Sequence, residues 1–138
     1  MKFKESITSK AHPFLEKKFS FCTLYYLENI VVSEIDYGIH FDWEKIQELI
    51  DDILLHYGED CKIGYVSNKI NSYSFEPNLW KHFFEKYSFL AGSASVCYTK
   101  INYINGLLEE KLSNKKVKAV KSLEEAIAWI SNLEALKK

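Results

Sequence analysis

Apolar residues recur along this chain with two spacings, one typical of strands and one typical of helices. Two runs rich in aromatic and β-branched residues, residues 19–28 and 30–36, meet at Glu28 and Asn29. They predict an antiparallel hairpin, because Asn tolerates the positive φ that a tight hairpin turn needs. Further strand-like runs are residues 62–68, 89–98 and 117–120.

Between these runs, apolar residues repeat every three or four positions, which predicts amphipathic helices. The first helix is expected over residues 43–57, with Asp42 as its N-cap and Gly58 as its stop. A second helix is expected to begin at Pro77, which suits the first helical position, and to end at about Tyr87.

Two more helices are expected in the second half of the chain. Thr99 is a good N-cap for a third helix. The inner face of that helix is expected to carry Ile101, Ile104, Leu108 and Leu112. Ser122 and Glu125 form a capping box in front of the final helix.

The predicted order of elements, ββαβαβαβα, indicates an α/β fold. Strands that alternate with helices favour a mixed, mostly parallel sheet with helices packed on it. The hairpin adds an antiparallel edge at the N-terminal end of that sheet.

Composition is that of one ordinary globular domain. Of the 138 residues, 47% are apolar and 27% are charged, and the formal net charge is -1. Such a charge argues against nucleic-acid binding. No run of eighteen apolar residues is present, so no membrane span is expected. Residues 1–18 are polar and lack the apolar core of a secretory signal, so we expect a mobile tail there and the folded domain over residues 19–138.

The residues that usually carry chemistry are scattered. Cys22, Cys61 and Cys97 lie far apart, which argues against disulfides or a zinc site and fits a reducing cytoplasm. Acidic neighbours such as Glu109 and Glu110 are expected on solvated helix faces. Motifs of the common enzyme classes are absent, so we expect a non-enzymatic protein without catalytic residues, metal or cofactor.

The end of the chain resembles a known family. The sequence VKAVKSLEEAIAWI, residues 117–130, is similar to the last strand and helix of SpoIIAA-like proteins, which have the STAS fold of anti-sigma-factor antagonists. With the order of elements, the resemblance covers about residues 19–136. It implies a bacterial protein that works by protein–protein recognition. The sequence leaves open whether the protein is a monomer or a homodimer.

The resemblance also implies a candidate regulatory residue. In anti-sigma-factor antagonists, a partner kinase phosphorylates a serine at the start of the second helix. The matching stretch here is INSYSFEP, residues 70–77, so Ser72 or Ser74 would be the phosphorylated or partner-contacting residue. The Asp-Ser-Ser-Gly motif of that family is absent, and turn or helix-cap chemistry is the alternative explanation for these polar residues.

A candidate pocket follows from the placement of two loops. Ligands of open α/β sheets bind beyond the carboxyl ends of the strands. The loops at residues 37–43 and 68–75 are both expected at that edge. The candidate lining residues are Tyr37, His40, Asn68, Lys69 and Tyr73.

Two functions remain open from the sequence. The leading hypothesis is a STAS-like regulatory module that binds a protein partner, such as a regulator or a kinase. The alternative is a module that binds a small molecule or lipid. The alternative draws on the 15% aromatic content and on the small-residue run AGSAS, residues 91–95, which leaves room for a ligand.

Overall fold

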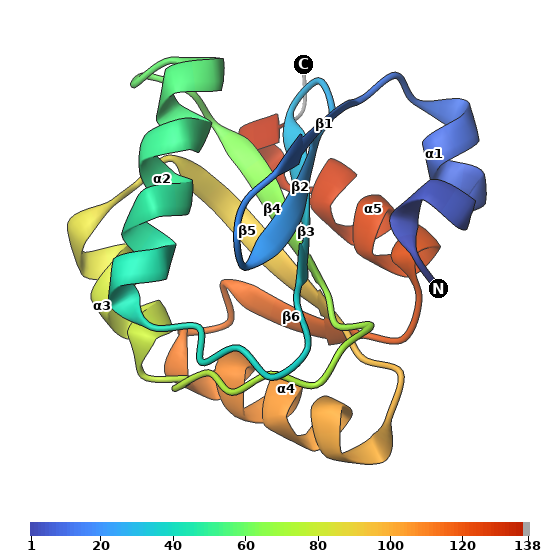
Figure 1. Ribbon diagram of the computed structural model, residues 1–138. Helices are drawn as coiled ribbons and strands as arrows, with labels where there is room; N and C mark the ends of the chain where they lie inside the picture. The colour runs from blue at the N-terminus through green and yellow to red at the C-terminus, as the bar shows by residue number, and fades with distance from the viewer. Residues whose placement is uncertain (137–138) are drawn as a thin grey trace.

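The structure, a computed structural model, describes residues 1–136 and contains a six-stranded sheet with helices on both faces (Figure 1). The strands lie side by side in chain order. Their bounds are Leu15–Lys18 (β1), Cys22–Tyr26 (β2), Ile30–Ile35 (β3), Ile63–Asn68 (β4), Leu90–Val96 (β5) and Val117–Val120 (β6). The β1–β2 and β2–β3 pairs are antiparallel, and β3 to β6 are parallel. The predicted mixed sheet is therefore confirmed.

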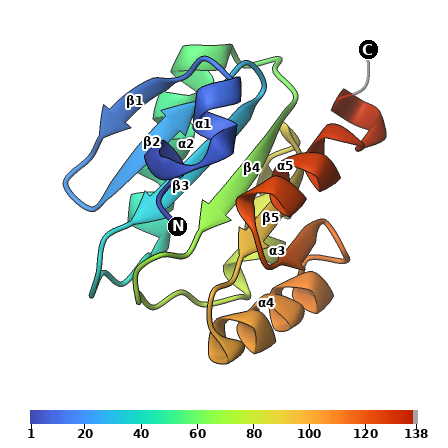
Figure 2. The same cartoon turned by 90° about the vertical axis from the view of Figure 1, so that its right-hand side faces the viewer.

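Helices divide between the two faces of the sheet (Figures 1 and 2). One face is covered by α2 (Trp43–Tyr57), α3 (Leu79–Lys86) and α4 (Lys100–Leu112). Each of these joins two neighbouring parallel strands, and right-handed crossovers between strands in chain order all fall on one side of the sheet. The other face is covered by α5 (Leu123–Ser131) and by the short N-terminal helices η1 (Phe3–Glu5) and α1 (Ile7–Ala11). A final short helix, η2, spans Glu134–Leu136.

Two apolar cores fill the spaces between the sheet and these helix layers. Successive side chains of a strand point to opposite faces. On β3, Val31 and Ile35 enter the core under α2 and α3, whereas Ile30 and Val32 enter the core under α5. The central strands are therefore buried on both sides, as parallel strands usually are.

The boundaries of α2 follow the predicted caps closely. Asp42 accepts a hydrogen bond from the backbone N–H of Lys45 at 3.1 Å, and Gly58 ends the helix with a φ of 94°. The expected start of the next helix is wrong by two residues. Pro77 lies in a tight turn, in which Trp80 N–H donates to the Pro77 carbonyl, and α3 begins at Leu79.

Residues 1–18 are a second correction, because they fold onto the sheet and do not form a mobile tail. Leu15–Lys18 pair with β2 as an edge strand, and Phe3 is fully buried. Ser6 caps α1 by accepting from the N–H of Ser9. The segment is polar because β1 is an edge strand with mostly exposed side chains. The amino-acid composition of residues 1–18 therefore does not reveal that they are folded.

The third correction concerns the orientation of α4. Its expected inner residues Ile101, Ile104 and Leu108 are 68%, 51% and 45% exposed, and Leu112 is only half-buried. Gly106 and Glu109 are the residues of α4 that are buried instead. A Cβ at Gly106 would lie 2.9 Å from the Cβ of Ala119, so the glycine allows α4 to approach β6 closely.

Candidate functional site

A small cavity lies between α2, α3 and the sheet face that they cover. Its volume is about 60 Å³, and most of its lining is apolar. The apolar lining includes Phe41, Leu49, Ile50, Trp80, Phe83 and Phe89. Tyr65, Ser67, Tyr73 and Glu109 contribute the polar atoms of the lining. Apolar walls with a few convergent polar groups are typical of small-molecule sites.

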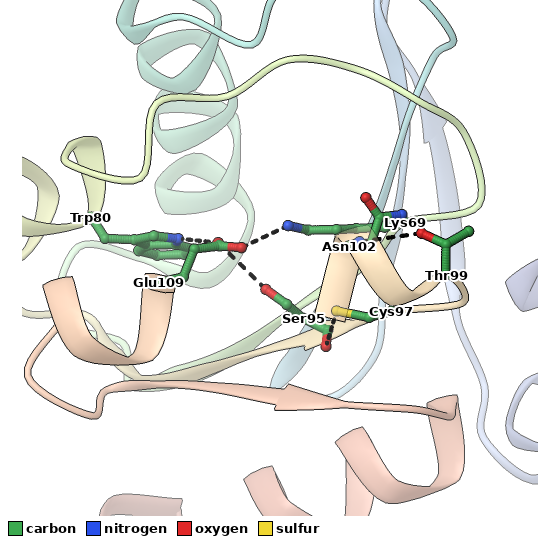
Figure 3. A network of polar contacts seen from close by, with 7 residues as sticks. All are labelled: Lys69, Trp80, Ser95, Cys97, Thr99, Asn102 and Glu109. Atoms are coloured by element: carbon green, nitrogen blue, oxygen red, sulfur yellow. Dashed lines mark hydrogen bonds and ion pairs between the residues drawn. The ribbon is translucent and has the colours of Figure 1, made fainter. Parts of the chain in front are cut away.

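Glu109 is the charged residue at this cavity, and it is only 2% exposed. Its Oε1 accepts a hydrogen bond from Trp80 Nε1 at 2.6 Å, and its Oε2 pairs with Lys69 Nζ at 2.7 Å. The hydroxyl of Ser95 lies 3.5 Å from Oε1. Figure 3 shows these three side chains converging on the carboxylate. A buried carboxylate is tolerated because a cation and a hydrogen-bond donor compensate its desolvation.

Four different elements supply this network. Lys69 directly follows β4, Trp80 lies at the start of α3, Ser95 lies on β5 and Glu109 lies on α4. Glu109 reaches the cavity because it lies one turn after Gly106, where α4 packs closely against Ala119 of β6. The sequence-based placement of Glu109 on a solvated face is therefore wrong.

Two tyrosine hydroxyls add a neutral polar surface to the cavity. Tyr65 donates to Ser33 Oγ at 2.6 Å, and Ser67 interacts with the hydroxyls of Tyr65 and Tyr73. Burial raises the pKa of both tyrosines above their usual range, and the nearby Glu109 carboxylate raises the pKa of Tyr73 further. Both phenols therefore stay protonated at neutral pH and are able to donate hydrogen bonds.

The two loops predicted to share one edge of the sheet are hydrogen-bonded to each other. The N–H groups of Gly38 and Phe41 donate to the carbonyls of Ser72 and Ser74, each at 2.8 Å. The Nδ1 of His40 lies 2.7 Å from the hydroxyl of Ser74. We call residues 37–42 and 70–76 the paired loops.

The predicted pocket residues do not gather at one place. Tyr73 lines the cavity, and Lys69 contacts Glu109 beside it. Tyr37 is 79% exposed, His40 lies on the surface of the paired loops, and neither lines the cavity. Asn68 is buried on the opposite face of the sheet, where it contacts Glu34 and Met1.

The two candidate phosphorylation residues are exposed. Ser72 and Ser74 lie several residues before Leu79, where α3 begins, so neither caps the helix nor occupies its first turn. The exposed loop differs in this respect from the helix start that the resemblance implies.

Sequence reasoning missed the buried acid, although the sequence carries a signal for it. Gly106, Glu109 and Ser113 follow each other at helical spacing and are buried, whereas the apolar residues Ile101, Ile104 and Leu108 are exposed. No cluster of three or more His, Cys, Asp or Glu residues able to hold a metal ion occurs within residues 1–136. None of the helices in this range has the length and apolar character required to cross a bilayer.

The arrangement of strands and helices has a counterpart among solved structures. It is an uncharacterized protein of the DUF3478 family from Shewanella loihica PV-4, described as having a SpoIIAA-like fold. The two structures align with a TM-score of 0.52 at 11% sequence identity, over 86% of this chain and 92% of the other. This chain has a SpoIIAA-like fold.

The likeness extends to the fold and not to the site. No protein-family model and no curated protein matches the sequence. A fold shared at 11% identity carries no information about individual site residues. Within this SpoIIAA-like fold, the cavity, the Glu109 network and the paired loops therefore have to be interpreted from their own geometry.

Proposed function

We propose that this protein is a non-enzymatic binding module that holds a small, mainly apolar molecule in the cavity between α2 and α3. The observation that carries the proposal is the combination of apolar walls with the buried polar groups of Tyr73, Ser67 and Glu109. Burial of the apolar part of a ligand stabilises the complex by about 25 cal/mol per Å². A hydroxyl or amine on the ligand would then orient it by donating to the Glu109 carboxylate.

The size of the cavity limits what enters without movement. A volume of about 60 Å³ is well below the roughly 150 Å³ that accommodates benzene in an engineered protein cavity. A ligand therefore requires α3 to move away from α2. This helix has only eight residues, and its N-cap Asn78 makes no side-chain capping bond. Its displacement would break the hydrogen bond from Trp80 to Glu109, which the ligand's own donor would then replace.

Thermal shift measurements with phenol, indole and 1-hexanol test this proposal, together with native mass spectrometry of the purified protein. We expect at least one compound to raise the Tm of the wild type. Ile50→Phe fills the cavity and is expected to abolish that shift. Leu55→Phe is the matched control, because Leu55 lies on the same helix but is 83% exposed. If no compound shifts the Tm and no bound species is detected, the proposal is wrong.

The second candidate function is recognition of a protein partner, such as a regulator or a kinase, through the paired loops. It is favoured by the exposure of Ser72 and Ser74 and by the contact between Ser74 and His40. A phosphate on Ser74 would add a charge of roughly -1.5 to -2 beside the imidazole of His40, whose Nδ1 lies 2.7 Å from the Ser74 hydroxyl. Such a change would alter the charge of the surface formed by both loops.

Phosphopeptide mapping of the protein isolated from its own cells tests this second candidate. We expect phosphate on Ser74, loss of the modified peptide in Ser74→Ala, and its retention in the control Ser72→Ala. Complete absence of phosphate from both serines in growing and in stationary cells would remove the support for a phosphorylation switch.

A further inference from the structure

The outward side of α4 carries a cluster of exposed apolar side chains. Ten large apolar residues are exposed within residues 1–136, and five of them lie within residues 98–108. In Figures 1 and 2, α4 lies at the lower end of the molecule, and no other helix or strand covers its outward side. Clustered apolar residues on a surface mark a place of interaction. The four on α4, which we call the α4 patch, are between 45% and 68% exposed: Ile101, Ile104, Leu107 and Leu108.

The charge of the chain is distributed unevenly, and it is positive around the α4 patch. Residues 98–121 hold six lysines and two glutamates, a net charge of +4, although the whole chain carries -1. Both glutamates form ion pairs with lysines. Lys100 and Lys111 are exposed at the two ends of the patch, and the exposed Lys115 follows α4. The surface around the patch is therefore complementary to a negatively charged partner.

A shallow hollow adjoins the N-terminal end of the patch. Tyr98, Lys100, Tyr103 and Lys121 are among its lining residues, and Lys121 Nζ lies 4.9 Å from the centre of the Tyr103 ring. Tyrosine and lysine suit the boundary between lipid tails and water, because each has an apolar body and a polar end. The volume of the hollow is about 390 Å³, many times the roughly 30 Å³ that a water molecule occupies in the liquid. A lipid phosphate group therefore fits between the two lysines.

A second copy of this chain fits the α4 patch poorly. If two α4 helices packed antiparallel about their middle, Lys100 of one copy would lie beside Lys111 of the other. A parallel pairing would place each lysine opposite its own counterpart. Both arrangements bring like charges together, which is unfavourable. The patch is also one convex side of a helix, whereas a helical peptide is usually bound in a groove.

We propose that the α4 patch is a docking surface for an anionic lipid membrane. In the docked state α4 lies parallel to the bilayer surface, with its apolar side chains among the upper parts of the acyl chains. Basic amphipathic helices bind membranes in this way, and lysines close to an anionic surface add electrostatic attraction. The inward side of α4, with Gly106 and Glu109 buried, keeps the helix packed on the sheet. The patch does not line the cavity, so this proposal does not depend on the proposed ligand.

Sedimentation of the full-length protein with lipid vesicles tests the proposal. One set of vesicles contains phosphatidylcholine alone, and the other also contains about 30% phosphatidylglycerol, which is anionic. We expect at least tenfold tighter binding to the anionic vesicles, because each lysine near the surface adds to the attraction. Binding is expected to weaken at high salt, since salt screens exposed charges.

The apolar contribution is tested by Ile104→Gln combined with Leu108→Gln. This double variant removes the middle of the patch and is expected to weaken binding to the anionic vesicles at least tenfold. Leu55→Gln is the matched control, because Leu55 is exposed on α2 and lies outside the patch. We expect this control to bind as the wild type does.

The contribution of charge is tested by Lys100→Gln combined with Lys111→Gln. Loss of two lysines from the membrane surface is expected to weaken binding about tenfold. Lys10→Gln combined with Lys18→Gln makes the same change in net charge at exposed residues of α1 and β1. We expect this control to weaken binding by no more than about twofold, because only charges close to the membrane contribute strongly.

Circular dichroism establishes that each variant is folded, and Ile101→Gln replaces the apolar double variant if that variant does not fold. The proposal is overturned if the protein does not prefer anionic vesicles, or if the α4 variants bind as their controls do. It is also overturned if light scattering finds a dimer that the apolar variant loses, because the occupant is then a second copy. Ile50→Phe, which fills the cavity, is expected to keep vesicle binding, so the two proposals fail separately.

Discussion

At the scale of single residues, the ion pair between Lys69 and Glu109 links the elements that surround the cavity. Both side chains are nearly buried, and Trp80 donates to the same carboxylate. A buried ion pair contributes little net stability compared with apolar residues, but removal of one partner leaves an uncompensated charge. The pair therefore acts as a constraint on the positions of α3 and α4 relative to β4.

Lys69→Met is expected to lower the free energy of unfolding by about 3–5 kcal/mol, because the Glu109 carboxylate loses its cation. The double variant Lys69→Met with Glu109→Gln is expected to recover part of this loss, since no charge then remains buried. Urea denaturation of the wild type, both single variants and the double variant gives the coupling energy. A double variant less stable than Lys69→Met alone would contradict this account.

A second prediction at this scale concerns the reactivity of the cysteines Cys61 and Cys97. Burial raises the pKa of Cys97 to about 11, and its Sγ would lie 3.2 Å from a Cβ at Gly106. Its thiol therefore stays protonated at pH 8 and is shielded by α4. Burial also raises the pKa of Cys61, but Cys61 is only half-buried, so a reagent reaches it more easily. Mass spectrometry after brief treatment with iodoacetamide is expected to find label on Cys61, with Cys97 labelled only in urea. Equal labelling of both in the native state would contradict the packing of α4.

The raised pKa of Cys97 also has a consequence for stability. Because its folded-state pKa exceeds the usual value of 9.0, the protonated thiol favours the folded state. This contribution is present below pH 9 and is lost as the pH rises through about 11.

At the scale of elements, α4 is the helix whose apolar periodicity predicts the wrong buried side. The order of strands and helices was predictable because each helix has its own cap and period, as Asp42 and Gly58 show for α2. The orientation of α4 was not predictable from its apolar residues, because it depends on how closely Gly106 approaches Ala119. The same contact buries Glu109, so the polar end of the cavity was also missed. The order of residues 1–18 escaped prediction because it depends on tertiary contacts, namely the burial of Phe3 and the pairing of Leu15–Lys18 with β2.

Substitutions on the two sides of α4 test this orientation. In a solvated helix, Gly→Ala is stabilising by roughly 1 kcal/mol. Gly106→Ala is instead expected to destabilise the protein by about 1–3 kcal/mol, because its Cβ would lie 2.9 Å from the Cβ of Ala119. Ile104→Lys, on the exposed side, is the control and is expected to change stability by no more than about 0.5 kcal/mol. Thermal denaturation of both variants measures the two changes in stability. If Ile104→Lys were the destabilising substitution and Gly106→Ala the neutral one, the apolar side of α4 would face inward.

At the scale of the whole molecule, the sheet separates two independent helix layers, and β4 takes part in both. Tyr65 points into the layer of α2 and α3, whereas Gly64 faces α5. The candidate cavity lies on one side of this strand and the N-terminal segment on the other. Stability of the molecule therefore depends on how closely each layer approaches β4.

Gly64 provides a test of that dependence on the α5 side. A Cβ at this position would lie 2.2 Å from Ile130 Cγ2, closer than any real Cβ contact, so α5 would have to shift. Gly64→Ala is expected to lower the free energy of unfolding by about 1–3 kcal/mol. Ile130→Ala removes the opposing methyl groups and leaves a cavity, at a cost of about 2–5 kcal/mol when made alone. Because the new methyl group at residue 64 fills part of that cavity, the double variant is expected to be more stable than the sum of the single effects predicts. Urea denaturation of all four proteins measures this coupling, and strictly additive effects would mean that α5 does not pack against β4 at Gly64.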